Sequence, residues 1–293
     1  MTSPRNAAAE LSHSTWCVIG GGNMASAIVL GALDAGVLVP DQFVVVELDA
    51  EKRAAFASRG IAAVEAIGEG IGWIGSRSAE GLHILLAVKP QALPTVTGVV
   101  ASAVRAALER AVSAPRVVSI LAGTPCSKLE SLLGTGTRVI RAMPNTPARI
   151  RRGTTAITCG KSCRAGDEGP TRALFASLGT VVDLDESLFD AFTAIAGSGP
   201  AYVFYLAEAL HNAAISQGFT AAQAELVVRS MLSGSADLLS RESTQSASAL
   251  RAAVTSRGGT TAAATAVFDA AGLMGIVSQA ISCATERGRE LSK

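Results

Sequence analysis

A glycine-rich segment near the start of the chain has the residue types of a dinucleotide-binding loop. Residues 18–25 read Val-Ile-Gly-Gly-Gly-Asn-Met-Ala, which fits the pattern G-x-G-x-x-A between an apolar run and a helical pattern. Gly20 permits a tight turn, Gly22 lets the backbone approach a pyrophosphate, and the small Ala25 allows a helix to pack closely on a strand. We predict a dinucleotide site here; a glycine turn without a ligand is the alternative.

The residues after the second apolar run bear on which dinucleotide binds. Glu47 ends that run and Asp49 follows it. An acidic residue at this position hydrogen-bonds the ribose 2′-hydroxyl of NADH and repels the 2′-phosphate of NADPH. Lys52 and Arg53 follow and offer positive charge to a phosphate, although their helical context favours a solvated face. The sequence therefore favours NADH slightly and leaves NADPH open.

Three further loops combine polar residues with glycine or proline. Residues 87–90 read Ala-Val-Lys-Pro and residues 141–147 read Arg-Ala-Met-Pro-Asn-Thr-Pro, each after an apolar run. Ligands of open α/β sheets bind at the carboxyl ends of the strands. Residues 255–261 read Thr-Ser-Arg-Gly-Gly-Thr-Thr, just before a helical pattern. Backbone N–H groups at a helix start, flanked by hydroxyls, favour an anion, so this third loop is a candidate anion site.

The first part of the chain alternates between short apolar runs and helical patterns. Such alternation predicts a parallel sheet that is covered on both faces. Residues 154–159 and 181–184 are expected as further strands at an edge, and the glycine-rich residues 60–81 fit no clear element. The expected strands of the main series are residues 16–20, 43–47, 83–88, 117–120 and 139–142.

After about residue 190 the pattern becomes entirely helical. Thr220 and Gln223 have the spacing of a capping box at a helix start. Residues 191–285 contain nine charged side chains in 95 positions, too few for a helical bundle that faces water on its outer side. We therefore expect this part to pack against a second copy of itself.

Composition excludes several classes of protein. The 293 residues contain 25 basic and 24 acidic side chains, so no basic face for a nucleic acid is expected. The most apolar stretch is interrupted by glycines and a proline, so we expect no membrane span. The five cysteines are scattered without zinc-ligand spacing, which favours no metal and reduced thiols in the cytoplasm. The predicted divisions are a flexible tail (1–15), a dinucleotide-binding domain (16–185) and a helical domain (186–293).

The ordered motifs together strongly resemble the pyrroline-5-carboxylate reductase family. They are the loop that ends in GGGNMA, then AVKP, RAMPNTP, GSGPAYVF at residues 197–204, and TSRGGTT. The resemblance implies an α/β Rossmann-type parallel sheet domain followed by an all-α dimerisation domain. It implies reduction of 1-pyrroline-5-carboxylate to L-proline with NADPH or NADH. It also implies a homodimer that can assemble further into rings such as decamers.

The resemblance also implies roles for individual residues. Thr261 would hydrogen-bond the ring nitrogen of the substrate and act as the catalytic residue, and Glu186 would lie near the substrate pocket. The other implied substrate contacts are in the glycine–threonine loop: Ser256, Gly258, Gly259, Thr260 and Thr261. The implied cofactor contacts are Gly20, Gly22, Asn23, Met24, Glu47, Ala87, Val88, Lys89, Pro90, Ala122 and Asn145.

The chain departs from the family pattern in three places. Arg257 stands where the loop usually has proline, residues 60–81 are longer than usual, and arginines stand at 149, 151 and 152 where apolar residues are common. Two alternatives stay open. One is a related two-domain dehydrogenase that acts on another imine or a β-hydroxy acid. The other is a dinucleotide-binding scaffold without turnover, for which Arg257 is the best support.

Overall fold

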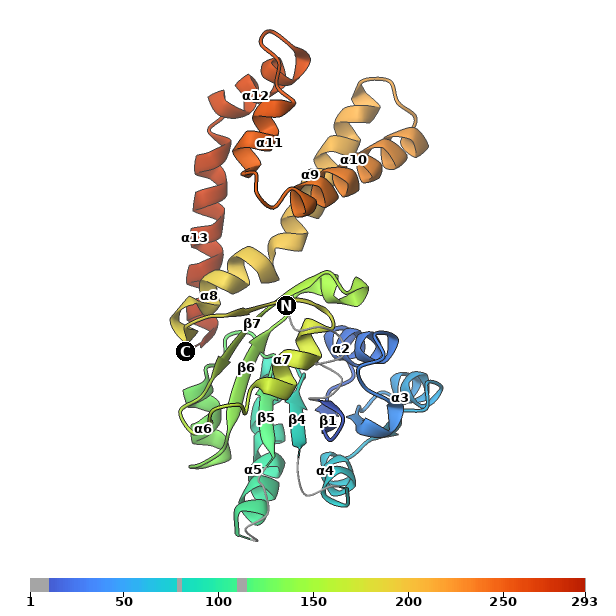
Figure 1. Ribbon diagram of the computed structural model, residues 1–293, viewed down its shortest axis with the longest axis vertical. Coiled ribbons are helices and arrows are strands. Elements are labelled where there is room, and N and C mark those ends of the chain that lie inside the picture. The colour runs from blue at the N-terminus through green and yellow to red at the C-terminus, as the bar shows by residue number, and fades with distance from the viewer. Residues whose placement is uncertain (1–10, 78–80, 110–114, 293) are drawn as a thin grey trace. The chain divides into compact units, whose positions relative to one another are not determined.

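The computed structural model describes residues 11–77, 81–109 and 115–292 (Figure 1). The chain divides into two compact units, one formed by Met1–Gly197 with Ala284–Lys293 and the other by Ser198–Cys283. The domain boundaries at residues 15/16 and 185/186 stay predictions.

One eight-stranded sheet forms the centre of the first unit, with the strand order β3-β2-β1-β4-β5-β6-β7-β8. Strands β1 to β6 are parallel, whereas β7 is antiparallel to β6 and β8 is parallel to β7. This confirms the Rossmann-type class and the two further strands expected toward one edge, β7 and β8, which run opposite to the first six. The strands are β1 (Thr15–Ile19), β2 (Phe43–Val46), β3 (Ala62–Val64), β4 (Leu82–Leu86), β5 (Arg116–Ser119), β6 (Val139–Met143), β7 (Gly153–Cys159) and β8 (Gly179–Asp183).

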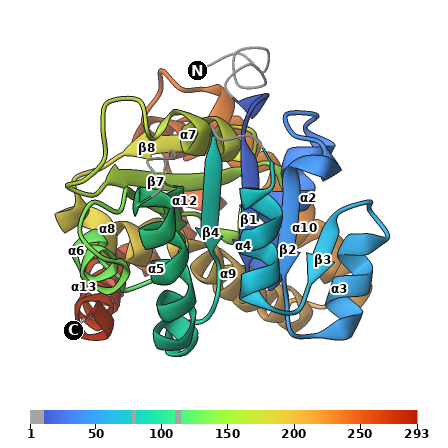
Figure 2. The same ribbon diagram turned by 90° about the horizontal axis from the view of Figure 1, so that it is seen from below.

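Helices cover both faces of this sheet. On one face lie α2 (Asn23–Asp34), α7 (Gly169–Ala176) and Phe56 of α3 (Ala50–Ala57). On the other lie α4 (Ile67–Gly75), α5 (Leu93–Glu109) and α6 (Cys126–Leu133), and Figure 2 shows α4 and α5 in front of the strands. Within β1, Trp16 packs on the first face and Cys17 on the second. Because alternate side chains enter different apolar layers, each central strand is an unbroken apolar run.

Two segments need comment: the predicted flexible tail (1–15) and the glycine-rich residues 60–81, for which the sequence predicted no clear element. Residues 1–10 of the predicted tail lie outside the described residues, but Leu11 is fully buried and its carbonyl accepts from Gln42 Nε2 at 2.8 Å. The glycine-rich segment contains β3 and α4. A Cβ at Gly70 would lie 2.5 Å from Val46 Cγ2, so this helix can approach the sheet only because glycine stands there.

The second unit is helical. It contains α9 (Gly199–Ser216), α10 (Ala221–Arg241), α11 (Ala247–Ala253), α12 (Thr260–Ala270) and most of α13 (Leu273–Ser292). Thr220 caps α10 as predicted, since Gln223 N donates to Thr220 Oγ1 at 3.3 Å and Thr220 N donates to Gln223 Oε1 at 3.0 Å. The short α11 was not predicted.

Large apolar side chains stay exposed on this helical unit. They include Phe204 at 68%, Tyr205 at 74% and Leu226 at 71% exposure. Among the described residues no single helix is long and apolar enough to cross a membrane, although α12 and α13, bent by 51°, together pass by length and composition.

The last turns of α13 belong to the first unit. A Cβ at Gly123, in the loop after β5, would lie 3.2 Å from the Leu291 backbone, and one at Gly288 would lie 3.3 Å from Asp190 Cβ. The C-terminal segment therefore packs closely on the loop after β5 and on the short helix α8 (Phe189–Phe192).

Candidate functional site

The glycine loop and the segment after β4 lie side by side. Gly20 has φ +99°, and its N–H donates to Val46 O at 2.8 Å. A Cβ there would lie 2.8 Å from Ala87 O and 3.1 Å from Val88 Cγ1. Both the left-handed backbone and the close approach therefore require glycine at this position. The structure thus brings together the first two predicted cofactor segments at the carboxyl ends of β1 and β4, in the middle of the sheet.

The start of α2 has the properties of a phosphate site. Its N-cap, Gly22, makes no side-chain capping hydrogen bond, and a Cβ there would have no atom within 4 Å. The first N–H groups of a helix lack partners in a preceding turn. The N–H groups at Asn23 and Met24 can therefore bind an anion, and Ala25, 1% exposed, seats the helix on the sheet. These residues fit a dinucleotide pyrophosphate.

Glu47 reaches back from the end of β2 to this loop. Its Oε2 accepts from Gly21 N at 2.8 Å and its Oε1 accepts from Asp49 N at 3.0 Å. A Cβ at Gly21 would lie 3.1 Å from the Glu47 carboxylate, so the two segments are in direct contact. A negative charge therefore lies at the position where the adenosine ribose of a dinucleotide is bound in this fold.

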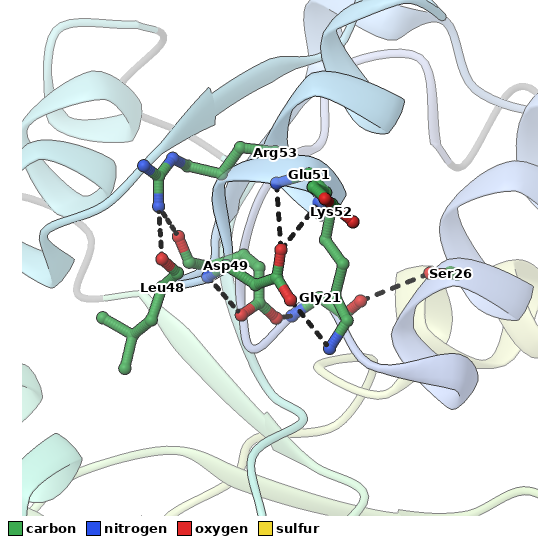
Figure 3. Close-up of polar contacts among 8 residues, drawn as sticks. Gly21, Ser26, Leu48, Asp49, Glu51, Lys52 and Arg53 are labelled. Atoms are coloured by element: carbon green, nitrogen blue, oxygen red, sulfur yellow. Dashed lines mark hydrogen bonds and ion pairs between the residues drawn. The ribbon is translucent and has the colours of Figure 1, made fainter.

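The two cations after Glu47, Lys52 and Arg53, have carbonyl and carboxylate partners within the protein (Figure 3). Arg53 Nη1 donates to the carbonyls of Glu47 and Leu48 at 2.8 and 2.7 Å. Beyond the residues drawn there, Arg53 Nη2 lies 3.0 Å from Glu65 Oε2. Lys52 Nζ lies 4.0 Å from the carboxylate of Asp49, which caps α3. Arg53 thus stabilises the β2–α3 turn.

The remaining predicted cofactor residues differ in accessibility. Lys89 is exposed, and its carbonyl accepts from Ala92 N at 2.9 Å in the turn that begins at Pro90. Ala122 is exposed in the loop after β5. Asn145, by contrast, is 8% exposed; its Nδ2 donates to Ala196 O and its Oδ1 accepts from Thr154 N, both at 2.9 Å. Its amide holds the loop after β6 in place.

Glu186 has two partners inside the first unit. Its Oε1 accepts from Arg141 Nη1 at 3.1 Å and from Cys126 N, at the start of α6, at 2.7 Å. Arg141 is 3% exposed, and its guanidinium lies 4.6 Å from the centre of the Phe189 ring. Sequence reasoning missed this role of Arg141. The signal was an arginine inside an apolar strand, because a buried cation requires a nearby carboxylate.

The glycine–threonine loop lies in the second unit. Gly258 has φ +73°, Gly259 N donates to Ser256 O at 3.0 Å, and Gly259 is the N-cap of α12 without a side-chain capping bond. Thr260 and Thr261 form the first turn of that helix. The loop therefore presents free N–H groups beside hydroxyls, which suits a carboxylate.

Comparisons with known proteins match this architecture. Residues 186–291 match the model described as pyrroline-5-carboxylate reductase dimerisation, and residues 15–123 match one described as NADP oxidoreductase, coenzyme F420-dependent. The pyrroline-5-carboxylate reductase of Haemophilus influenzae is 36% identical, with 96% of this chain and 98% of that one aligned. The chain belongs to the pyrroline-5-carboxylate reductase family.

Further pyrroline-5-carboxylate reductases agree over nearly their full length. The one from Pseudomonas aeruginosa is 34% identical over 94% of this chain and 96% of its own. The solved structure of the Coxiella burnetii enzyme has a TM-score of 0.84 and 30% identity, and the match covers 96% and 99% of the two chains.

This reductase therefore reduces 1-pyrroline-5-carboxylate to proline with a nicotinamide dinucleotide. That activity is favoured over the two alternatives, another imine or β-hydroxy-acid dehydrogenase and a scaffold without turnover. Within the described residues, no group of three or more His, Cys, Asp or Glu side chains has the arrangement of a metal site.

The arginines by which this reductase departs from the family pattern lie on its surface. Arg257 is exposed, as are Arg149, Arg151 and Arg152. Arg151 has φ +56° and ends the 3₁₀ turn Thr146–Ile150.

Proposed function

We propose that this reductase uses NADH in preference to NADPH. The observation that supports this proposal is the position of the Glu47 carboxylate, which accepts a hydrogen bond from Gly21 N–H beside the ribose position. It repels a 2′-phosphate and can accept from a ribose hydroxyl. Arg53 is engaged by two carbonyls and Glu65, so binding a 2′-phosphate would require it to exchange those partners.

The cofactor site comprises the loop residues Gly20, Gly22, Asn23 and Met24 together with the segments after four other strands. When bound, the dinucleotide supplies the hydride. Glu47 holds the ribose and the carboxyl-end loops line the nicotinamide side. The residues of those loops are Ala87, Val88, Lys89, Pro90, Ala122 and Asn145.

The substrate is held by the loop before α12. Its carboxylate accepts from the N–H groups of this loop, in which Ser256, Gly258, Gly259 and Thr260 take part. The Thr261 hydroxyl hydrogen-bonds the ring nitrogen and keeps or delivers its proton. Most of the remaining rate acceleration comes from positioning the substrate against the dinucleotide, because a protonated cyclic imine is already electrophilic. Such positioning can lower the activation barrier by ~7–11 kcal/mol. Glu186 lies near the substrate pocket.

The catalytic form is a homodimer, which assembles further into rings such as decamers. The exposed apolar side chains of α9 and α10, together with the dimerisation match, support this. Packing two copies would remove these side chains from water at ~25 cal/mol per Å². The partner's helical unit then supplies the substrate loop, so a stable monomer is inactive. The enzyme works in the cytoplasm on a small molecule, without nucleic acid or membrane.

Two measurements test the proposal. The first follows oxidation of NADH and of NADPH by the purified protein with 1-pyrroline-5-carboxylate; a higher kcat/KM with NADPH would overturn the cofactor assignment. The second compares sedimentation with activity across a dilution series. Activity is expected to fall as dimers dissociate, and a fully active monomer would contradict the shared site.

A further inference from the structure

Two cysteines of the first unit lie at one pocket beside the amino end of β6, whereas the proposed cofactor loops follow the carboxyl ends of strands. Cys159 is the last residue of β7 and is exposed, and Cys163 is partly buried. Both line an open pocket of about 490 Å³, together with Arg164, Glu168 and Arg172. Neither thiol has a role in the reduction described above. From this arrangement we propose that Cys159 and Cys163 form a thiol–disulfide site, in which Cys159 attacks a low-molecular-weight disulfide and Cys163 resolves the product.

The turn between the two cysteines is fixed by its neighbours. Gly160 N donates to Val139 O at 2.8 Å, and Cys163 Sγ lies 3.1 Å from the same carbonyl. Cys163 N donates to Gly160 O at 3.2 Å, which closes the turn. On the other side Ser162 N lies 3.3 Å from Glu130 Oε1. These hydrogen bonds hold the short turn between the two cysteines in one conformation. A short, fixed turn favours ring closure over reaction with a second protein.

Exposure and hydrogen bonding make Cys159 the attacking thiol, because Cys159 is exposed whereas Cys163 is partly buried. A hydrogen bond from Cys163 lowers the pKa of Cys159, and Arg172 acts in the same direction. Burial of the thiol and the charges of Glu168 and Asp167 oppose this shift, and the lowering prevails. Glu168 Oε2 lies 3.9 Å from Cys159 Sγ, so a proton acceptor is also present. The same hydrogen bond raises the pKa of Cys163, which therefore stays protonated until Cys159 has reacted.

The exchange balances without a further reactant. The Cys159 thiolate attacks one sulfur of the disulfide RSSR, and RS⁻ leaves as the mixed disulfide forms. Cys163 then loses its proton and attacks Cys159 Sγ, the bond to the second RS group breaks, and an intramolecular disulfide remains. The two protein thiols are oxidised by two electrons, and RSSR is reduced to two RSH that carry the two protons. A cytoplasmic disulfide of this kind is transient, because cellular thiols reverse it.

Oxidised glutathione is the probe, with intact mass and peptide mapping as readouts. The wild-type protein is expected to lose two hydrogens with a Cys159–Cys163 bond, and dithiothreitol should reverse this. Cys163→Ser should stop at a glutathione adduct on Cys159. Cys159→Ser should react slowly at Cys163. Cys283→Ser, which removes an exposed thiol of the other unit, should behave as wild type.

Several outcomes would overturn the proposal. They are a persistent glutathione adduct on wild-type Cys159, no adduct in Cys163→Ser, or modification of Cys283 at the same rate as Cys159. Because Cys163 touches the apolar core, Cys163→Ala serves as a second variant if the serine lowers Tm. Glu168→Gln gives a further test. Removing this charge should shift the pH–rate profile for the reaction of Cys159 with oxidised glutathione to lower pH, which is not expected if the pocket has no influence on the thiol.

Discussion

The Glu186 carboxylate lies 3.1 Å from the guanidinium of Arg141, a cation that is 3% exposed. The two residues are 45 positions apart in the chain, and the same carboxylate oxygen also accepts from Cys126 N. Glu186 therefore links strand β6 to the start of α6. This position gives the residue a structural task beside its proposed place near the substrate.

Glu186→Ala is expected to destabilise the enzyme by ~2–4 kcal/mol, because it leaves a buried guanidinium without its carboxylate. The lower part of that range allows for the one-third exposure of the Glu186 side chain. Urea unfolding measures the effect. Glu186→Asp and the double variant with Arg141→Met are the controls, and the double variant should recover part of the loss. A large fall in kcat/KM with unchanged unfolding would instead assign Glu186 to the substrate alone.

Glu47→Gln is expected to lower the ratio of kcat/KM for NADH over NADPH about tenfold, since one charge near a phosphate changes binding by ~1.4 kcal/mol. Glutamine keeps the acceptor for Gly21 N–H, so the loop should stay intact. The matched control is Glu51→Gln, which removes an exposed charge from the first turn of α3. Equal changes in both variants would show that the charge acts at long range and not through the position of Glu47.

Thr261→Ala is expected to reduce kcat/KM at least about tenfold, the scale of one lost hydrogen bond to a charged group, with little change in cofactor affinity. Thr261→Ser should recover most of the activity because it restores the hydroxyl. Thr265→Ala is the control: its hydroxyl bonds within α12, to Thr261 O at 3.0 Å. Steady-state kinetics with a fluorescence titration of the dinucleotide separate the two effects, and unchanged kinetics would remove Thr261 from the mechanism.

His83 is expected to make the stability of the enzyme sensitive to acid. Burial lowers the pKa of His83 to about 3, and the charge of Arg116 acts in the same direction. The unfolded chain therefore binds this proton at a higher pH than the folded one. Stability should fall as pH drops below about 6.5 and continue to fall toward pH 3, by up to ~1.4 kcal/mol per pH unit.

His83→Phe should flatten this part of the stability curve, measured by urea unfolding at each pH. Phenylalanine can keep the stacking on Trp16, whose ring centre lies 4.2 Å from that of His83. His83→Gln is the control, because it keeps a donor for Gly81 O, 2.8 Å from Nδ1, without a titrating group. If both variants retain the wild-type slope, other groups cause the acid sensitivity.

Local patterns were sufficient for the strands other than β3, for the glycine loop and for several helix starts. Continuous apolar runs such as Phe43–Val46 identify strands buried on both faces, and the Thr220 capping box locates the start of α10. These features depend on residues close together in sequence, so they can be read from it. The short α11 lacks a long apolar period and was missed.

Long-range contacts decided the rest. Helix α4 contains four glycines in nine residues, and it forms where Gly70 fits against Val46 and Cys17. The reversed direction of β7 depends on its pairing with β6, which a local apolar pattern does not encode.

The sequence by itself determined the residue types of the site: a glycine loop, an acidic residue after β2 and a glycine–threonine loop before a helix. Only the tertiary structure decided which polar atoms of the candidate site already make hydrogen bonds within the protein. Examples are the pairs Glu47 with Gly21, Glu186 with Arg141, and Asn145 with Thr154. The physical reason is that a hydrogen bond needs two groups within about 3 Å, and folding brings them together from distant parts of the chain.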